Sequence, residues 1–232
     1  MAALTVDGHE LLVEPESDPV MWGAYPMIPF AGRLREGHFE FDGVSYTLPT
    51  NFAPHAIHGY GFLAAWDHID DHTIGWTFRD PWPFAGSATQ HFSLTDDSLT
   101  ITLHTHATES QPMMLGVHPW FRRQTSAGEL TFELPECSMY RRDTTGLPDG
   151  TLVTPPAGPW DDCFCQLESD PVLRWGDLEV RLSASSDHWV IYTEADHALC
   201  VEPQTGPPNA FNSAPHRLEA GDSLSLRFTM SW

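Results

Sequence analysis

Apolar and polar residues alternate with a period of two along most of this chain. That period is typical of half-buried β-strands, because successive side chains of a strand point to opposite faces of the sheet. The 17 glycines and 20 prolines interrupt the pattern too often for long helices. No amphipathic stretch exceeds about two helical turns. The pattern therefore predicts an all-β protein, built as a sandwich or barrel of antiparallel sheets within one domain, residues 1–232.

Two hairpins are predicted from their turns. Residues 38–48 alternate on both sides of Asp42-Gly43, a dipeptide that favours two-residue hairpin turns. Residues 88–95 and 98–106 flank Asp96-Asp97 and form the second predicted hairpin. The Pro-rich segment 147–160 is interpreted as a long surface loop. Further strands are expected at 129–134, 178–184, 188–194, 198–202 and 223–231.

The charge of the chain argues against several classes of partner. Thirty-two acidic residues face 11 basic ones, which are all arginine, for a net charge of −21. Such a surface repels phosphate backbones and anionic lipids, so we expect no nucleic acid or membrane partner. It also disfavours a heavily phosphorylated substrate. No apolar run of about 18 residues is present, and the N-terminus lacks the pattern of a signal peptide, so a cytoplasmic location is expected.

The four cysteines are irregularly spaced and form no C-x-x-C pair. Free thiols in a reducing compartment are the simplest interpretation. Histidine is more abundant, and His104 and His106 would share one strand face, where they could ligate zinc. An exposed strand face explains the same pattern, so no metal site is predicted.

Two residues suit proton transfer. His118 lies among apolar residues directly before Pro119, which restricts its backbone and favours an aimed, desolvated imidazole. Glu202 follows an apolar strand and precedes Pro203, a position where burial can tune a carboxyl pKa. A core histidine and a solvated strand-end glutamate are the ordinary structural alternatives.

Three further residues suit the binding of hydroxyl groups. Arg33, between small and apolar neighbours, presents a planar fork of donors to vicinal hydroxyls or to a carboxylate. His58 precedes Gly59 in a turn that allows close approach. Either Asp161 or Asp162 is a candidate acceptor. The alternatives are an ordinary ion pair for Arg33, a structural role for His58, and a solvated pair of loop carboxylates for Asp161 and Asp162.

Taken in order, these segments resemble the aldose 1-epimerase (galactose mutarotase) family. Members carry an N-R-I motif followed by G-x-F, then a His-Gly motif, G-x-H-P-Y-F, D-x-x-F and a late E-P segment. Each motif is weak alone, but five in the same order make a specific signal. The matching segments here are Gly32-Arg33-Leu34 with Gly37-His38-Phe39, Ile57-His58-Gly59, Gly116 to Phe121, Asp161 to Phe164, and Glu202-Pro203.

The resemblance implies a large antiparallel β-sandwich whose concave face holds a monosaccharide, with no cofactor or metal. It implies that Glu202 is the base on the anomeric hydroxyl and His118 the acid on the ring oxygen. Arg33, His58 and Asp161 would hold sugar oxygens. Trp120, Trp66 and Phe62 are candidates for stacking on the sugar ring.

This chain departs from the family pattern at three points. Gly32 stands where members have Asn, Trp120 stands where they have Tyr, and only 32 residues precede Arg33, fewer than in typical members.

The motif matches as a whole imply a mutarotase for a free aldose. A carbohydrate-binding module on the same fold and a hexose-6-phosphate 1-epimerase remain as alternatives, and either a monomer or a homodimer is compatible with the sequence.

Overall fold

Strands make up nearly all of the regular structure, as the alternation predicts. The computed structural model describes residues 1–232 and contains 24 strands and two 3-10 helices, η1 (Arg35–Gly37) and η2 (Ala210–Asn212). No helix in it has the length and apolar character needed to cross a membrane.

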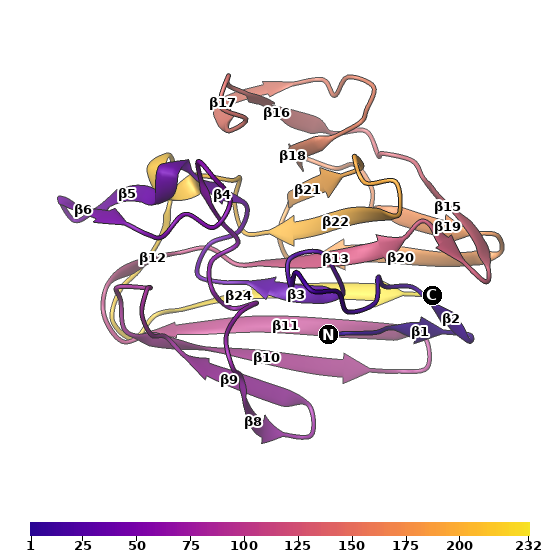
Figure 1. The fold of residues 1–232 in the computed structure, drawn as a ribbon, viewed down its shortest axis with the longest axis horizontal. Helices are drawn as coiled ribbons and strands as arrows, with labels where there is room; N and C mark the ends of the chain where they lie inside the picture. The colour runs from indigo at the N-terminus through magenta and orange to yellow at the C-terminus, as the bar shows by residue number, and fades with distance from the viewer.

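The larger sheet has nine antiparallel strands, and it extends from the lower edge of Figure 1 up its right-hand side. Its strands, in spatial order, are β14 (Gln124–Thr125), β15 (Gly128–Phe132), β19 (Val172–Trp175), β20 (Leu178–Ala184), β24 (Ser223–Ser231), β11 (Ser98–Ala107), β10 (Gly86–Leu94), β9 (Thr73–Thr77) and β8 (Asp67–Asp70).

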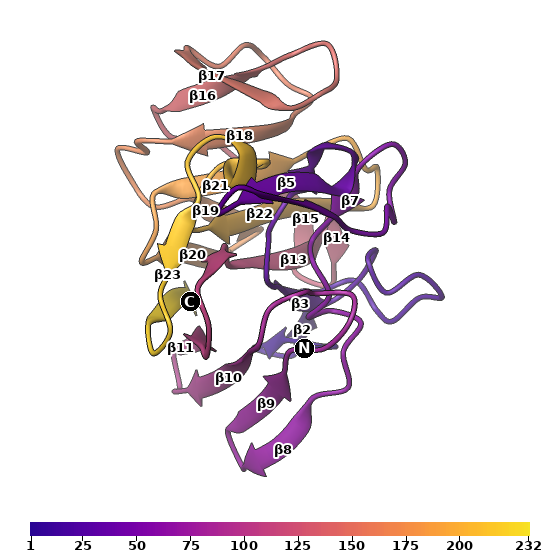
Figure 2. The same ribbon diagram turned by 90° about the vertical axis from the view of Figure 1, so that its left-hand side faces the viewer.

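The second sheet has seven antiparallel strands and carries most of the segments singled out by their motifs. In spatial order they are β17 (Pro148–Val153), β16 (Ser138–Arg142), β18 (Asp161–Cys165), β21 (His188–Tyr192), β22 (Ala198–Gln204), β13 (Gly116–Arg122) and β3 (Ala24–Met27). Both views place the β16–β17 hairpin at one end of the molecule and β8 at the other (Figures 1 and 2).

Short two-stranded pairs complete the fold. They are β1 (Thr5–Val6) with β2 (His9–Glu10), β4 (Arg33–Leu34) with β7 (Ala56–Ile57), β5 (His38–Phe41) with β6 (Val44–Thr47), and β12 (Gln111–Met113) with β23 (His216–Leu218).

The two large sheets pack through one continuous apolar core of 50 buried residues. Trp189 of β21 meets Phe228 of β24, with ring centroids 6.3 Å apart, and Phe121 of β13 meets Trp175 of β19 at 6.2 Å. Because side chains alternate along a strand, the neighbours of Phe121 and Trp189 point to the opposite face of the seven-stranded sheet. The outer face of the seven-stranded sheet is therefore not covered by the other large sheet, and its side chains are available to form a site.

Both predicted hairpins are confirmed. In β5–β6, Asp42 and Gly43 have φ values of 51° and 74°, the left-handed conformation that a two-residue type I′ turn requires at both positions. β10 and β11 pair over nine residues, from Gly86–Ala107 to Leu94–Leu99.

The prediction of a surface loop at 147–160 is wrong in its first half. Residues 148–153 form β17, which pairs with β16. β17 lies at the edge of the sheet, where Pro148 can begin a strand because no partner on its outer side needs an amide donor. The prolines of the segment therefore mark an edge strand as well as a loop.

Candidate active site

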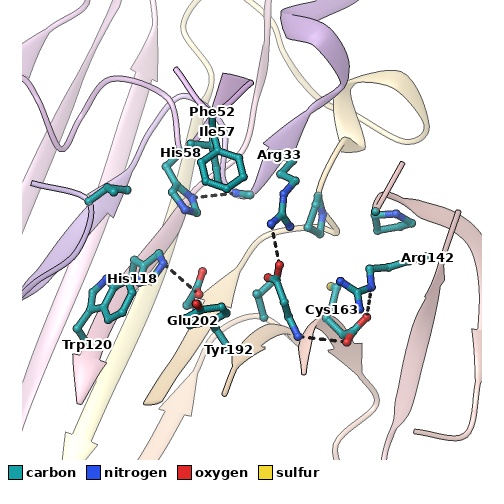
Figure 3. A pocket seen from close by; sticks show the side chains of 18 of the residues that line it. Arg33, Phe52, Ile57, His58, His118, Trp120, Arg142, Cys163, Tyr192 and Glu202 are labelled. Carbon is teal, nitrogen blue, oxygen red and sulfur yellow. Dashed lines mark hydrogen bonds and ion pairs between the residues drawn. The ribbon is translucent and has the colours of Figure 1, made fainter. Parts of the chain in front are cut away.

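A pocket lies on the face of the seven-stranded sheet that points away from the sandwich core. Its floor comes from β13, β22, β21 and β18, and its walls come from Arg33, His58 and the turn that joins β16 to β17 (Figure 3). The free volume is about 830 Å³ including the open mouth. All five predicted site residues line it: Arg33, His58, His118, Asp161 and Glu202.

Strand register brings distant residues together on the floor. Residue pairs on either side of His118 and Glu202 keep one register between β13 and β22, so these two lie opposite each other on adjacent strands. The same row continues across the sheet to Tyr25 on one side and to Val190 and then Cys163 on the other. His118 Nε2 lies 3.2 Å from Glu202 Oε1.

Burial drives both members of this pair toward their neutral forms. His118 is 5% exposed and Glu202 is 2% exposed. Desolvation raises the pKa of the Glu202 carboxyl well above its usual range, and the nearby Asp161 raises it further. Desolvation also lowers the pKa of the His118 imidazole well below its usual range, with His58 adding to the effect. The pair can exist as the Glu202 carboxylic acid with a neutral His118 imidazole, or as the Glu202 carboxylate with a His118 imidazolium. These two forms differ only in which partner holds one titratable proton, so that proton can move between them without changing the net charge of the pair.

His58 is held as a neutral hydrogen-bond donor. Burial, followed by the charge of Arg33, lowers the pKa of His58 to about 3. Its Nδ1 accepts a hydrogen bond from the Gly32 amide at 3.3 Å, which leaves the proton on Nε2. The backbone here passes close to its neighbours: Gly59 has a φ of 63°, and a Cβ on it would lie 2.2 Å from the Ile28 carbonyl oxygen. The close approach expected at Gly59 is therefore present.

Two ion pairs line the side of the pocket away from His118 (Figure 3). Arg33 Nη2 lies 2.7 Å from Asp161 Oδ2, and Arg142 Nε lies 2.8 Å from Asp162 Oδ1. Asp161 and Arg33 keep 18% and 21% of their side chains exposed, so both retain polar atoms that can meet a ligand. Asp162 is buried, and that burial raises its pKa against the opposing effect of Arg142. Each pocket guanidinium thus already has a carboxylate partner.

Of the three aromatic residues expected to stack on a sugar, only Trp120 lines the pocket. Phe62 packs against Tyr25 and Trp66 packs against Trp76, and neither lines the pocket. Two further aromatic residues that line the pocket, Tyr192 and Phe52, are not predicted from the sequence. Tyr192 reaches the pocket because it lies across from Cys200 in the β21–β22 register. Phe52, which is half exposed, lies at the rim with the Arg33 guanidinium 5.4 Å from its ring centroid.

The departure at Gly32 has a structural reason. Gly32 has a φ of 65°, and a Cβ added there would meet the side chain of Pro208 at 2.8 Å. A residue with a side chain is therefore excluded while Pro208 occupies that place. Since Pro208 itself lines the pocket, one apolar ring takes the position of a polar side chain.

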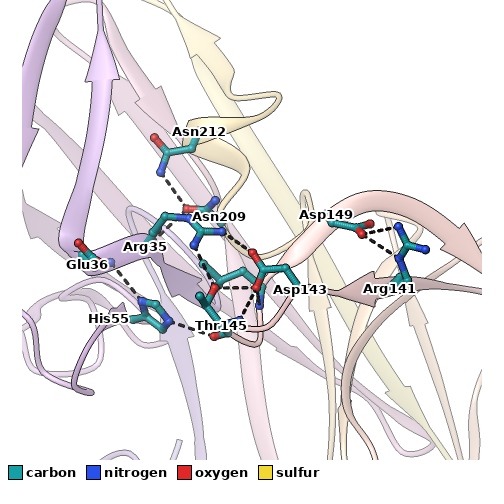
Figure 4. A network of polar contacts seen from close by, with 10 residues as sticks. Arg35, Glu36, His55, Arg141, Asp143, Thr145, Asp149, Asn209 and Asn212 are labelled. Atoms are coloured by element: carbon teal, nitrogen blue, oxygen red, sulfur yellow. Dashed lines mark hydrogen bonds and ion pairs between the residues drawn. The ribbon is translucent and has the colours of Figure 1, made fainter.

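A polar network outside the pocket ties the β16–β17 turn to the segments that carry Arg33 and His58 (Figure 4). Arg35 donates from Nη2 to Asp143 at 2.7 Å and from Nη1 to Thr145 at 3.0 Å. His55 lies 3.3 Å from the Thr145 carbonyl oxygen through Nε2 and accepts from the Glu36 amide at Nδ1. Gly146 of this turn and Pro148, the first residue of β17, line the pocket, so this network positions one of its walls.

The surface histidines are not part of this site. His104 Nδ1 lies 2.8 Å from Ser225 Oγ, and His106 makes a longer contact with Ser223 on the outer face of the nine-stranded sheet. All four cysteines are free, and three of them are buried: Cys163, Cys165 and Cys200.

Comparison with known proteins gives a consistent result. A sequence model of the family described as aldose 1-epimerase matches residues 1–231. The chain is 28% identical over 264 residues to the uncharacterized protein YihR of Escherichia coli K12, covering 94% of this chain and 85% of that protein. It is 30% identical over 137 residues to the uncharacterized protein YphB of the same organism, covering 48% and 47%.

Solved structures share the fold at low sequence identity. Galactose 1-epimerase from Lactobacillus acidophilus superposes with a TM-score of 0.81 at 15% identity, covering 100% of this chain and 87% of that one. A galactose mutarotase-like protein from Clostridium acetobutylicum gives 0.81 at 18% identity, covering 96% and 85%. These likenesses confirm the predicted antiparallel β-sandwich.

Proposed function

The chain belongs to the aldose 1-epimerase family, and from that membership we propose that it interconverts the α and β anomers of a free aldose by acid–base opening and closure of the sugar ring. The observation that carries the proposal is the contact between His118 Nε2 and Glu202 Oε1 at 3.2 Å on the pocket floor. Ring opening removes a proton from O1 and delivers one to the ring oxygen. Both oxygens are bonded to the same carbon, so the base and the acid must be close neighbours.

The proposed roles follow from the proton held by this pair. With the carboxylate–imidazolium form facing the sugar, Glu202 takes the proton of the anomeric hydroxyl while His118 protonates the ring oxygen. The pair is left as carboxylic acid and neutral imidazole, the form that burial favours. After rotation about C1–C2, the reverse transfers close the ring on the other face. The pair therefore ends each turnover with the proton count with which it began.

The walls supply binding and orientation. His58 Nε2–H and the free donors of Arg33 suit sugar oxygens, and Asp161 both holds Arg33 and offers an acceptor. The hexose-6-phosphate alternative is disfavoured because Arg33 and Arg142 are already paired with carboxylates. An added phosphate would meet Asp161 and Asp162 as well as the two arginines.

Polarimetry of freshly dissolved α-glucose and α-galactose, followed by other free aldoses and their 6-phosphates, tests the proposal. We expect the protein to speed the decay to the equilibrium rotation and Glu202→Gln to reduce the rate constant by about 10²- to 10⁴-fold. Glu194→Gln, at an exposed glutamate, is the matched control and should keep the rate. Saturable sugar binding without acceleration would instead establish the binding-module alternative. Acceleration confined to phosphorylated sugars would establish the phosphate alternative.

A further inference from the structure

Cys200 lies beside the His118–Glu202 pair and has no part in the proposed proton transfers. It precedes Glu202 by two residues on β22, so both side chains point to the same face of the sheet. One ligand atom from each of His118, Cys200 and Glu202 lies within 4.8 Å of the other two. All three residues are buried, with Cys200 0% exposed.

This set of donor atoms matches the preferences of zinc. Imidazole nitrogen, thiolate sulfur and carboxylate oxygen are the ligand types that Zn²⁺ takes in proteins, at about 2.0–2.3 Å. Tetrahedral bonds of that length place ligand atoms roughly 3.2–3.8 Å apart. The His118–Glu202 contact of 3.2 Å already meets this requirement. The other ligand atoms lie within 4.8 Å of one another, so zinc binding requires their separations to shorten by about 1 Å. Because β13 and β22 are inner strands of the sheet, we expect side-chain rotation and not backbone movement to supply this change.

The charge balance also favours a divalent cation at this position. One neutral imidazole, one thiolate and one carboxylate carry two negative charges, so a bound Zn²⁺ gives an electrically neutral centre in a desolvated place. Neutral centres cost less to bury than the bare charges would. The net charge of −21 attracts divalent cations to the protein surface, and His118 and Glu202 face the pocket, which provides the path of entry.

We propose that His118, Cys200 and Glu202 form an inhibitory zinc site, in which one Zn²⁺ occupies both proton-transfer groups and blocks the reaction. Zinc binds to the three side chains and displaces two protons to solvent, one from the Cys200 thiol and one from the His118–Glu202 pair. The fourth position faces the pocket and takes water. The inhibition rests on the proposed function, whereas metal binding does not.

Cobalt(II) titration tests the metal site independently of activity. Thiolate-bound Co²⁺ absorbs in the near ultraviolet by charge transfer from sulfur, so wild-type protein in a non-coordinating buffer should develop this band and lose it on addition of zinc. Cys200→Ser should abolish the band. Cys163→Ser, which changes the buried thiol two strands beyond Glu202 in the same row, is the matched control and should retain the band. Absence of the band from the wild type, or its persistence in Cys200→Ser, would overturn the proposal.

The inhibitory consequence is measured by polarimetry with each protein compared to its own zinc-free rate. We expect zinc to inhibit the wild type and Cys163→Ser reversibly, with recovery on chelation, and Cys200→Ser to need at least about 100-fold more zinc, because a ligand is lost. Since two protons leave, zinc affinity should rise by up to about 100-fold per pH unit. Equal inhibition of Cys200→Ser and the wild type would overturn the assignment. A wild type that shows the cobalt band but accelerates no sugar would contradict the proposed function and leave the metal site standing.

Discussion

The indole ring of Trp120 lies nearly parallel to the imidazole of His118, with centroids 5.4 Å apart and an interplanar angle of 7°. Tyr25 stacks on the same imidazole with its centroid at 4.8 Å. His118 Nδ1 has no hydrogen-bond partner in the protein, so these two rings, together with the contact to Glu202, orient the imidazole. Orientation by stacking is a different arrangement from the usual carbonyl or carboxylate partner at the second ring nitrogen.

Replacing the stacking ring should therefore impair proton transfer more than sugar binding. We expect Trp120→Leu to lower kcat about 10-fold or more, and Trp120→Phe, which keeps a ring at this position, to recover most of the loss. Steady-state polarimetry gives kcat and KM, and the His118 imidazole signals in NMR report whether its titration changes. Equal kcat values for the Leu and Phe variants would show that the stack does not position His118.

The kcat of the proposed reaction should be independent of pH around neutrality. With usual pKa values, a carboxyl and an imidazole hold one proton between them only from about pH 4.3 to 6.5. Here burial raises the pKa of Glu202 well above its usual range and lowers that of His118 well below it, so the carboxyl and not the imidazole holds the shared proton, and loss of that proton follows the raised pKa of Glu202. We expect kcat to stay constant through pH 6.5 and to decline only well above it, as the pair loses its last proton. A rate that peaks near about pH 5.5 and falls through pH 6.5 would contradict this account.

Removing the acid of Glu202 should stabilise the fold at neutral and alkaline pH. The folded-state pKa of this carboxyl is raised, so above its unfolded-state pKa the folded protein binds more protons than the unfolded one. The free energy of unfolding then decreases as pH rises toward the folded-state pKa. Glu202→Gln removes this dependence and keeps a similar shape. We expect its Tm to exceed that of the wild type at pH 8 by more than at pH 5, as measured by scanning calorimetry.

The Arg33–Asp161 ion pair should act mainly on substrate affinity. Asp161→Asn keeps the shape but removes the charge that holds the guanidinium 2.7 Å away. We expect KM to rise about 10- to 100-fold, the equivalent of one charge-assisted hydrogen bond, with a smaller change in kcat. Asp196→Asn, at an exposed aspartate outside this pocket, should leave both constants unchanged. A loss confined to kcat would place Asp161 in the chemical step instead.

The Arg35–Asp143 contact should hold the wall that the β16–β17 turn contributes. Hydrogen bonds from Thr145, and then from Arg35, lower the pKa of Asp143, so the carboxylate persists over the ordinary pH range. Asp143→Asn is expected to raise KM several-fold while kcat stays within about twofold, and to speed hydrogen exchange of residues 143–147.

Asp149 provides the matched control, since it pairs with Arg141 in the same hairpin but does not line the pocket (Figure 4). Asp149→Asn should leave KM unchanged. If both substitutions raise KM equally, the effect belongs to the stability of the hairpin and not to the contact with Arg35.

Local signals account for the elements that could be predicted. The Asp42-Gly43 turn and the alternation around it specify their hairpin because they act between neighbours in sequence. The segment 147–160 was misinterpreted because a proline-rich strand is stable only at a sheet edge, and an edge is a property of the whole sheet. Tyr192 was missed for a similar reason, since its place in the pocket comes from pairing with β22.

By itself, the sequence determined the fold class, the two hairpins and the five motif segments, because alternation, turns and short motifs are local properties. Only the tertiary structure decided that His118 faces Glu202, that each pocket arginine has a carboxylate partner, and that Cys200 lies beside the pair. The contacts of His118 with Glu202 and of Arg33 with Asp161 join segments more than 80 positions apart, and the first of them depends on the register between β13 and β22. Register is set by how both faces of the sheet are buried, which no single segment encodes.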